Sequence, residues 1–286
     1  MRGMLARILT AAVLIPMVLA LVWWGPPALL AAIAAGVSVL ALLEFFNLAG
    51  RMGLRAFRDW TLACAAGIFY AQYAAGLIET HSFQGVSIVR DAGWRISLEA
   101  VLLIFIFGMA AIGIGTKRRF YEVLPGMAAS SAGLLFVALP FSYLVRINEI
   151  ERSGRMLVLF TLLLVWAGDT LAYFVGKALG HVPMAPELSP KKTWEGAFAN
   201  LIGSLLVGFL FARWMQVDTV PLLVIAALGN IAGQIGDLIE SAYKRGAAAK
   251  DSGSLLPGHG GMLDRIDSLI LASPVVWVAW RWFEAR

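Results

Sequence analysis

The sequence predicts an all-α, polytopic membrane protein with about nine transmembrane helices and a cytoplasmic N-terminus. Hydrophobic residues make up 60% of the chain and charged residues 14%, whereas soluble domains are about half apolar and about a quarter charged. Apolar runs of the roughly 17 to 25 residues needed to cross a bilayer recur along the whole chain. No long polar domain separates them, which excludes an ordinary soluble globular fold.

The predicted spans are, in chain order, residues 5–24, 27–50, 60–79, 97–116, 124–145, 155–179, 196–216, 219–240 and 268–283. The first has a basic start, Arg2 and Arg7, as a cleaved signal peptide would. It lacks a small-residue cleavage site and is long enough to span despite Pro16, so we expect a retained helix. The single cysteine, Cys64, excludes an internal disulfide, and no Cys/His cluster has zinc spacing.

The orientation follows from the basic residues, because short cytoplasmic loops carry an excess of Lys and Arg. With nine spans, 15 of the 23 cations fall on the side of the N-terminus and eight on the other side. The cations of residues 177–265 could belong to a site. Without them, the loops around the first five spans still place eight cations on the side of the N-terminus and five on the other side. The N-terminus and the polar segments 180–195 and 244–267 are therefore expected in the cytoplasm, and the C-terminus outside.

The two halves of the chain differ in their polar content. Residues 1–150 are predicted to be transmembrane scaffold helices that could also carry a dimer contact. Glu44 and Glu99 lie near span ends there, and we expect them at the membrane interface rather than in catalysis. Residues 151–286 hold nearly all of the candidate chemistry, and they are predicted to form the catalytic transmembrane region with its cytoplasmic loops.

The eighth span carries a polar stripe. Its polar residues recur at steps of four, three, four and three, and so share one helix face: Asn230, Gln234, Asp237, Ser241 and Lys244. One interpretation is helix packing, because Gly229, Gly233 and Gly236 would let another helix approach and amides can bond across it. Packing does not explain Asp237, since a carboxylate in hydrocarbon is costly unless partnered or hydrated. We therefore expect Asp237 to be functional.

The sixth span shows the same anomaly. Asp169, Tyr173 and Lys177 lie one helical turn apart and share a face. Asp169 could contact an ion or a substrate, or it could form a buried ion pair with Lys177 or with a cation from another helix.

The segment SPKKTWEG, residues 189–196, predicts a helix start. Ser189 suits an N-cap and Pro190 the first helical position, which would place Lys191 and Lys192 in the first turn. Cations there oppose the helix dipole, whereas an anion docked at that helix end would favour them. The alternative is that the lysines only mark the cytoplasmic face.

The glycine-rich segment 244–267 combines cations with carboxylates. Its five glycines and Pro257 exclude a long regular helix and let backbone N–H groups approach an anion. The groups suited to phosphate are Lys244, Arg245, Lys250 and Arg265, and the hard oxygen ligands suited to Mg²⁺ are Asp251, Asp264 and Asp267, together with Asp237. This mixture predicts a site for a metal–polyphosphate complex. His259 could be an acid/base, a phosphate donor or a structural group, and no known phosphate-loop or kinase motif is present.

The residues from Ser241 to Asp267, SAYKRGAAAKDSGSLLPGHGGMLDRID, closely resemble the signature of the phosphatidate cytidylyltransferases, also called CDP-diacylglycerol synthases. GDTLAYFVGK at 168–177 and SPKKTWEG at 189–196 are also similar to that family. Tyr243 departs conservatively from the family's usual aliphatic residue or Phe. The motifs cover the C-terminal half, while the first 150 residues resemble the family mainly in being hydrophobic.

The resemblance implies a multi-pass enzyme of the cell (inner) membrane that transfers CMP from CTP to phosphatidic acid at the cytoplasmic side. It implies a homodimer, no nucleic-acid partner and Mg²⁺ dependence, with a second cation such as K⁺ plausible. The metal ligands would be Asp237 and Asp264, with Asp169 as a further candidate. The catalytic residues would be Asp237, Asp264, Lys250 and Arg265, and the substrate-binding residues Ser189, Lys191, Lys192, Thr193, Ser241, Lys244, Arg245, His259, Gly260 and Gly261.

Two alternatives remain open at this point. A CTP-dependent kinase of a polyprenol or related lipid would share the nucleotide site but transfer the γ-phosphate. A membrane transporter would also use polar stripes and a glycine-broken connection, although the phosphate-type groups here gather on one side only.

Overall fold

The computed structural model describes residues 2–79, 82–83, 86–87, 96–253 and 260–284 of the chain. Its helices are α1 (Arg2–Trp24), α2 (Pro27–Arg51), α3 (Arg58–Glu79), α4 (Leu98–Gly115), α5 (Phe120–Gly133), the π-helical turn η1 (Leu134–Ala138), α6 (Leu139–Asn148), α7 (Gly154–Leu179), α8 (Trp194–Met215), α9 (Thr219–Gly246) and α10 (Leu263–Glu284). Two antiparallel strand pairs are β1 (Ser82–Phe83) with β2 (Val86–Ser87), and β3 (Pro183–Ala185) with β4 (Ser189–Thr193).

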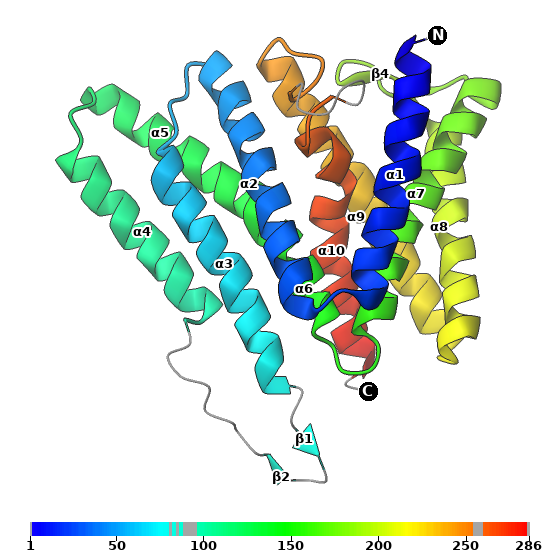
Figure 1. Cartoon of the computed structure of the whole chain (residues 1–286). Coiled ribbons are helices and arrows are strands. Elements are labelled where there is room, and N and C mark those ends of the chain that lie inside the picture. The colour runs from blue at the N-terminus through cyan, green and yellow to red at the C-terminus, as the bar shows by residue number, and fades with distance from the viewer. Residues whose placement is uncertain (1, 80–81, 84–85, 88–95, 254–259, 285–286) are drawn as a thin grey trace.

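These helices form one bundle in which successive helices alternate in direction, so that α1 begins at one end and α10 ends at the other (Figure 1). Each predicted apolar run forms a helix, and α5, η1 and α6 continue one another over the fifth run. Within the described ranges, seven segments are long and apolar enough to cross a membrane, and residues 12–24 of α1 form a shorter apolar stretch. The all-α, polytopic membrane class is confirmed, while nine crossings and the N-terminal orientation stay predictions.

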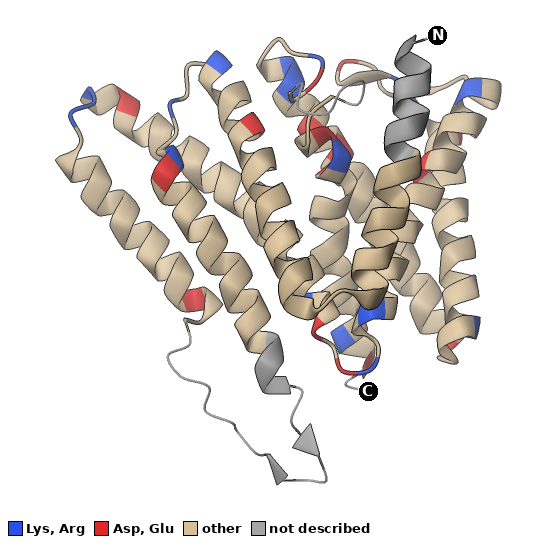
Figure 2. Cartoon of the chain, viewed as in Figure 1, with Lys and Arg blue, Asp and Glu red and all other residues tan. Residues whose placement is uncertain are grey.

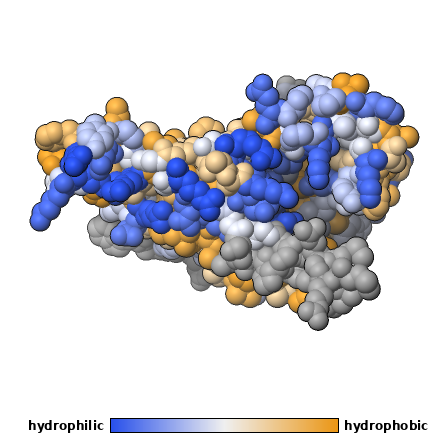
Figure 3. Space-filling view, turned by 90° about the horizontal axis from the view of Figure 1, so that it is seen from above, coloured by the Kyte–Doolittle hydropathy of each residue, from blue (hydrophilic) through white to orange (hydrophobic). Residues whose placement is uncertain are grey.

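The surface of the bundle is that of a membrane protein. Large apolar side chains are exposed along the outer helices, among them Ile106, Phe107, Phe198 and Leu210, which in water would be an unfavourable patch. Charged residues gather at the two ends of the bundle (Figure 2). Hydrophilic residues also cover the end that is seen from above in Figure 3. The lateral surface therefore suits lipid and the ends suit water.

The bundle has two packed groups of helices that share a core. α7 packs most extensively against α8, and α9 against α10, while α2 and α3 pack beside α6. Phe46 of α2, Phe160 and Leu164 of α7 and Ile225 of α9 are among the fully buried side chains. Because α10 contacts α2, α6, α7 and α9, the first half of the chain packs directly on the half that carries the chemical motifs.

The prediction of a helix start at Ser189 and Pro190 is wrong. Residues 189–193 form strand β4, and α8 begins at Trp194, where Thr193 is the N-cap and its Oγ1 accepts a hydrogen bond from the Gly196 amide at 3.2 Å. Starting here puts Glu195 in the first turn, which the helix dipole favours, whereas a start at Ser189 would put two lysines there. Lys191 and Lys192 therefore lie on strand β4 and not in the first turn of a helix.

Candidate active site

A cavity of about 760 Å³ lies between α7, α8, α9 and the β3–β4 hairpin. Its lining brings together residues from three of the segments that the sequence singled out: Asp169, Tyr173, Lys177, Lys191, Lys192, Thr193 and Asp237. The hairpin and the loop after α9 lie at the same end of the bundle as the start of α1 (Figure 1). The cavity therefore joins the interior of the bundle to one of its polar ends.

Lys192 and Asp237 connect the hairpin to α9 inside this cavity. The Lys192 Nζ lies 2.6 Å from Asp237 Oδ2, and the two side chains are 27% and 31% exposed. The Lys192 Nζ atom itself is buried against Asp237, so the exposed part of its side chain is the stem, whereas Asp237 is partly exposed in the cavity. Opposite charges placed side by side fit a ligand that itself carries both signs, such as a metal–polyphosphate complex.

A buried network of amides supports the inner end of the cavity. Asn200 of α8 donates to Asp169 Oδ1 at 3.1 Å, and Asn230 of α9 donates to Ser204 Oγ at 2.6 Å. Gln234 donates in turn to Asn230 Oδ1 at 2.7 Å. Asp169 is thus held by an amide in this structure, and the ion pair with Lys177 that the sequence allowed is not among its contacts.

The packing interpretation of the polar stripe is confirmed for its inner part, and the functional role expected for Asp237 stays a prediction. Asn230 and Gln234 bond across helices, whereas Asp237 faces the cavity. Asn200 and Ser204 on α8 are not among the residues predicted from the sequence. Their signal was their spacing of one helical turn within an otherwise apolar run.

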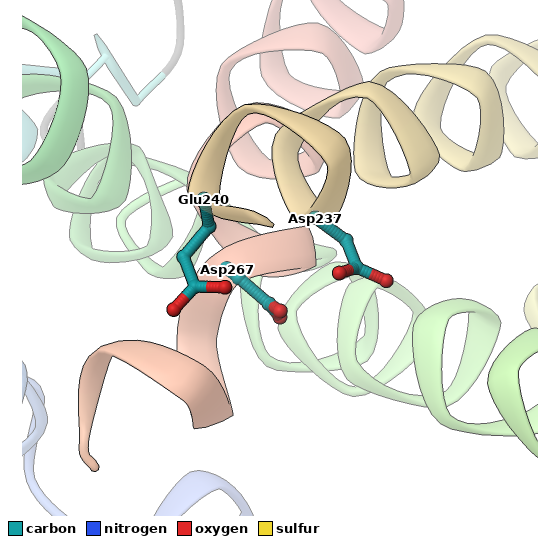
Figure 4. A group of neighbouring side chains, drawn as sticks. All are labelled: Asp237, Glu240 and Asp267. Carbon is teal, nitrogen blue, oxygen red and sulfur yellow. The ribbon is translucent and has the colours of Figure 1, made fainter. Parts of the chain in front are cut away.

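Three carboxylates meet where α9 crosses α10. Asp237, Glu240 and Asp267 have ligand oxygens that all lie within 4.8 Å of one another, and Figure 4 shows them projecting from the two helices toward a common region. The helices approach closely because α9 has a glycine there: a Cβ at Gly236 would lie 2.5 Å from the Asp267 carbonyl oxygen. A close group of hard oxygen ligands fits a divalent cation such as Mg²⁺.

Asp264 lies beside this group and has its own partners. Its Oδ1 accepts from Lys244 Nζ at 2.7 Å, and its Oδ2 accepts from the amides of Ser252 at 3.0 Å and Gly261 at 2.8 Å. Lys244 also forms an ion pair with Glu240, so it links Asp264 to the three-carboxylate group. The assignment of Asp264 as a metal ligand together with Asp237 stays a prediction.

Arg245 fastens the β3–β4 hairpin to the end of α9. Its Nε donates to the carbonyl oxygen of Leu188 at 3.0 Å. Ser189 comes directly after Leu188, is the first residue of strand β4 and is partly buried. In this structure Arg245 positions the strand that carries the two lysines, and its predicted contact with substrate stays a prediction.

The other predicted residues lie outside the cavity lining. Lys250 and Arg265 are exposed at the end of the bundle, and Ser241 is buried in α9. Gly260 adopts a positive φ of 76° just before the start of α10. His259 lies outside the described residues, so its role stays open.

Glu44 of α2 was expected at the membrane interface, and this expectation is wrong. Its side chain is buried, at 7% exposure. Its Oε2 accepts hydrogen bonds from Ser252 Oγ and from the Leu263 amide, both at 2.9 Å. A single carboxylate within an apolar run was the only signal in the sequence, and its partners lie too far along the chain for periodicity to reveal.

Comparison with known proteins identifies the family of the chain. The family model described as the cytidylyltransferase family matches residues 5–283. A phosphatidate cytidylyltransferase of Brucella abortus is 34% identical over 284 residues, covering 97% of this chain and 93% of the relative. One of Bacillus subtilis is 35% identical over 185 residues, covering 64% of this chain and 66% of the relative. One of Staphylococcus saprophyticus is 35% identical over 205 residues, covering 70% and 77%. The chain therefore belongs to the cytidylyltransferase family and is a nucleotidyltransferase of the phosphatidate cytidylyltransferase type.

Proposed function

We propose that this protein transfers CMP from CTP to phosphatidic acid, giving CDP-diacylglycerol and pyrophosphate, at the cytoplasmic side of the cell (inner) membrane. The observation that carries the proposal is the cavity in which Lys191 and Lys192 of β4 lie beside Asp237 of α9. The names of the similar proteins support the same substrates. The cavity lies at a polar end of a bundle with apolar flanks, where a lipid headgroup and a water-soluble nucleotide can both arrive.

The cations of the cavity suit the binding of two phosphorylated substrates. Lys177 of α7 and the two lysines of β4 line the same space, so their charges can offset those of a triphosphate and a phosphomonoester brought together. Lys192 is held by Asp237 in this structure. Binding of a polyphosphate would give Lys192 an alternative anionic partner and free the Asp237 carboxylate.

The three-carboxylate group would hold Mg²⁺ through Asp237, Glu240 and Asp267, with Asp169 and Asp264 as the neighbouring carboxylates. When bound there, a divalent ion would supply positive charge to the phosphates at the reacting centre. A second cation, such as K⁺, and a homodimer belong to the same proposal.

The reaction needs little acid–base chemistry from the protein. The second pKa of a phosphate monoester is about 6, so phosphatidate is largely dianionic near neutral pH. One of its oxygens forms a bond to the α-phosphorus of CTP, and the bond from that phosphorus to the bridging oxygen breaks, so pyrophosphate leaves with the electron pair. The residues of the cavity have to bring two polyanions together and offset their charge.

The decisive assay uses purified protein, phosphatidic acid, Mg²⁺ and CTP labelled at either the α- or the γ-phosphorus. We expect the α label in the lipid product and the γ label in pyrophosphate. Transfer of the γ label to a lipid would instead identify a kinase, and no label in any lipid would contradict a nucleotidyl transfer to phosphatidic acid.

Lys191→Ala is expected to weaken substrate binding more than turnover. The side chain lines the cavity and is exposed, so its loss should leave the fold intact. A hydrogen bond to a charged group contributes about 1.5 to 3 kcal/mol, so we expect KM for CTP or phosphatidic acid to rise roughly 10- to 100-fold. Steady-state kinetics with each substrate varied in turn would measure the change. Lys117→Ala, at an exposed lysine between α4 and α5, is the control; unchanged KM values for both substrates in Lys191→Ala would remove Lys191 from the site.

A further inference from the structure

Helix α2 reaches the loop that connects α9 to α10, although the two are far apart in the sequence. Glu44 accepts hydrogen bonds from Ser252, 208 positions later, and from Leu263, 219 positions later. One residue further along α2, the ring of Phe45 packs edge-on against the ring of Tyr243 of α9, with centroids 5.3 Å apart. Glu44 therefore sits at a contact between the N-terminal helices and the segment that resembles the family signature.

The carboxylate of Glu44 and that of Asp264 share one hydroxyl group. Ser252 Oγ lies 2.9 Å from Glu44 Oε2 and 2.9 Å from Asp264 Oδ2. A serine hydroxyl has a single proton and donates to only one carboxylate at a time. The Ser252 amide also donates to Asp264 Oδ2. Ser252 therefore links the Glu44 carboxylate to the Asp264 carboxylate.

The loop is shaped to admit the Glu44 side chain. A Cβ at Gly253 would lie 2.3 Å from Glu44 Oε1, and a Cβ at Gly261 would lie 2.3 Å from Glu44 Oε2. A side chain at either position would overlap the carboxylate unless the end of the Glu44 side chain moved away. Two glycines of the signature-like segment thus make room for a residue of α2.

Burying the Glu44 carboxylate in this space is unfavourable in free energy. In the part of the chain that the structure describes, Glu44 Oε1 has no hydrogen-bond partner, and Oε2 has one amide and one hydroxyl. Burial of a charge is unfavourable unless it is well compensated. A neutral residue of similar size would pack there at lower cost, so packing alone does not account for Glu44.

We propose that Glu44 is a positioning residue for the site, an inference that rests on the proposed function. By binding Ser252 and Leu263, it fixes the serine that contacts Asp264 and the start of α10, on which Asp264 lies. It also fixes the first turns of α10, which carry Asp267 to the three-carboxylate group. The N-terminal helices thereby shape the site as well as supporting it.

The test compares Glu44→Gln and Ser252→Ala with the wild-type full-length protein and with Glu99→Gln. Glu99 is an exposed glutamate in the first turn of α4, so it controls for the loss of a carboxylate elsewhere in the N-terminal helices. For each protein we would measure kcat with α-labelled CTP and phosphatidic acid, the Mg²⁺ concentration for half-maximal activity, and the unfolding midpoint with and without Mg²⁺ in the absence of substrates.

Groups that orient metal ligands typically affect activity or metal affinity by about 10- to 100-fold. We therefore expect Glu44→Gln to lower kcat or raise the Mg²⁺ requirement by roughly tenfold or more, and to reduce the shift of the unfolding midpoint by Mg²⁺. Ser252→Ala should change the same quantities in the same direction, and the double variant should lose less than the product of the single losses. Glu99→Gln should match the wild type.

The inference is overturned if Glu44→Gln keeps the wild-type kcat and Mg²⁺ response. It is also overturned if activity falls only in proportion to the folded fraction, because a purely structural residue would behave in that way. If Glu44→Gln does not fold, the kcat and Mg²⁺ response of Ser252→Ala test the same hydrogen bond through its other partner. If the wild type transfers no α label, the proposed function fails. The role of Glu44 is then tested only by comparing how far Mg²⁺ shifts the unfolding midpoint of Glu44→Gln and of the wild type.

Discussion

Asp237→Asn is expected to leave a folded protein that is almost inactive, with kcat lowered roughly 100- to 1,000-fold, the scale seen when one group that stabilises transition-state charge is lost. Asp237 belongs to both parts of the site. It lines the cavity beside Lys192, and its carboxylate belongs to the group formed with Glu240 and Asp267. Asparagine has nearly the same shape but carries no negative charge, so it would be a poor ligand for Mg²⁺.

The fold should tolerate this change because Asp237 is only partly buried and the side-chain oxygen of asparagine can still accept a hydrogen bond from Lys192. Asp218→Asn is a matched control, since Asp218 is an exposed aspartate at the other end of the same helix and makes no capping hydrogen bond. Turnover would be measured with α-labelled CTP over a range of Mg²⁺ concentrations, together with the unfolding midpoint. Wild-type turnover by Asp237→Asn at saturating Mg²⁺ would exclude the role assigned to this carboxylate.

The sequence predicted which residues line the cavity better than it predicted which of them contact one another. The polar stripe of α9 could be found because helical spacing converts sequence positions directly into a face. The pairing of Lys192 with Asp237 could not be found, because it depends on how the β3–β4 hairpin folds over α9. Periodicity within one element carries no information about which elements meet.

The two wrong expectations have a common physical cause. Ser189 has the right side chain for an N-cap, but Thr193 caps the helix instead, because pairing of β4 with β3 extends the chain up to that point. Glu44 looked like an interfacial charge because its neighbours along α2 are apolar, yet its partners come from a loop about two hundred positions later. In both cases a tertiary contact decided what local sequence left open.

Asp264→Asn is the second substitution with a large expected effect. Four groups lie within hydrogen-bond distance of Asp264: Lys244 at Oδ1, and at Oδ2 the amides of Ser252 and Gly261 and the Ser252 hydroxyl that it shares with Glu44. An asparagine can keep one acceptor oxygen toward the two amides only by turning its NH₂ group toward the Lys244 ammonium. That contact replaces an ion pair by two donors facing each other, and Lys244 would then keep only Glu240.

We therefore expect Asp264→Asn to lower kcat roughly 100-fold or more and to destabilise the protein by about 1 to 3 kcal/mol, the cost of leaving a buried donor or acceptor unsatisfied. The measurements are turnover with α-labelled CTP across a Mg²⁺ titration and the unfolding midpoint. Asp218→Asn, at an exposed aspartate just before α9 at the other end of the bundle, is again the control.

The Mg²⁺ titration of Asp264→Asn also separates two roles for this carboxylate. A direct metal ligand would make the Mg²⁺ requirement rise most strongly, because asparagine binds the ion poorly. A residue that mainly holds Lys244 and the loop would lower kcat at every Mg²⁺ concentration, because the charges around the three-carboxylate group would change even with the ion bound. Since all four observed contacts of Asp264 are to donors of the chain itself, we expect the second pattern, and normal turnover with a normal unfolding midpoint would contradict both roles.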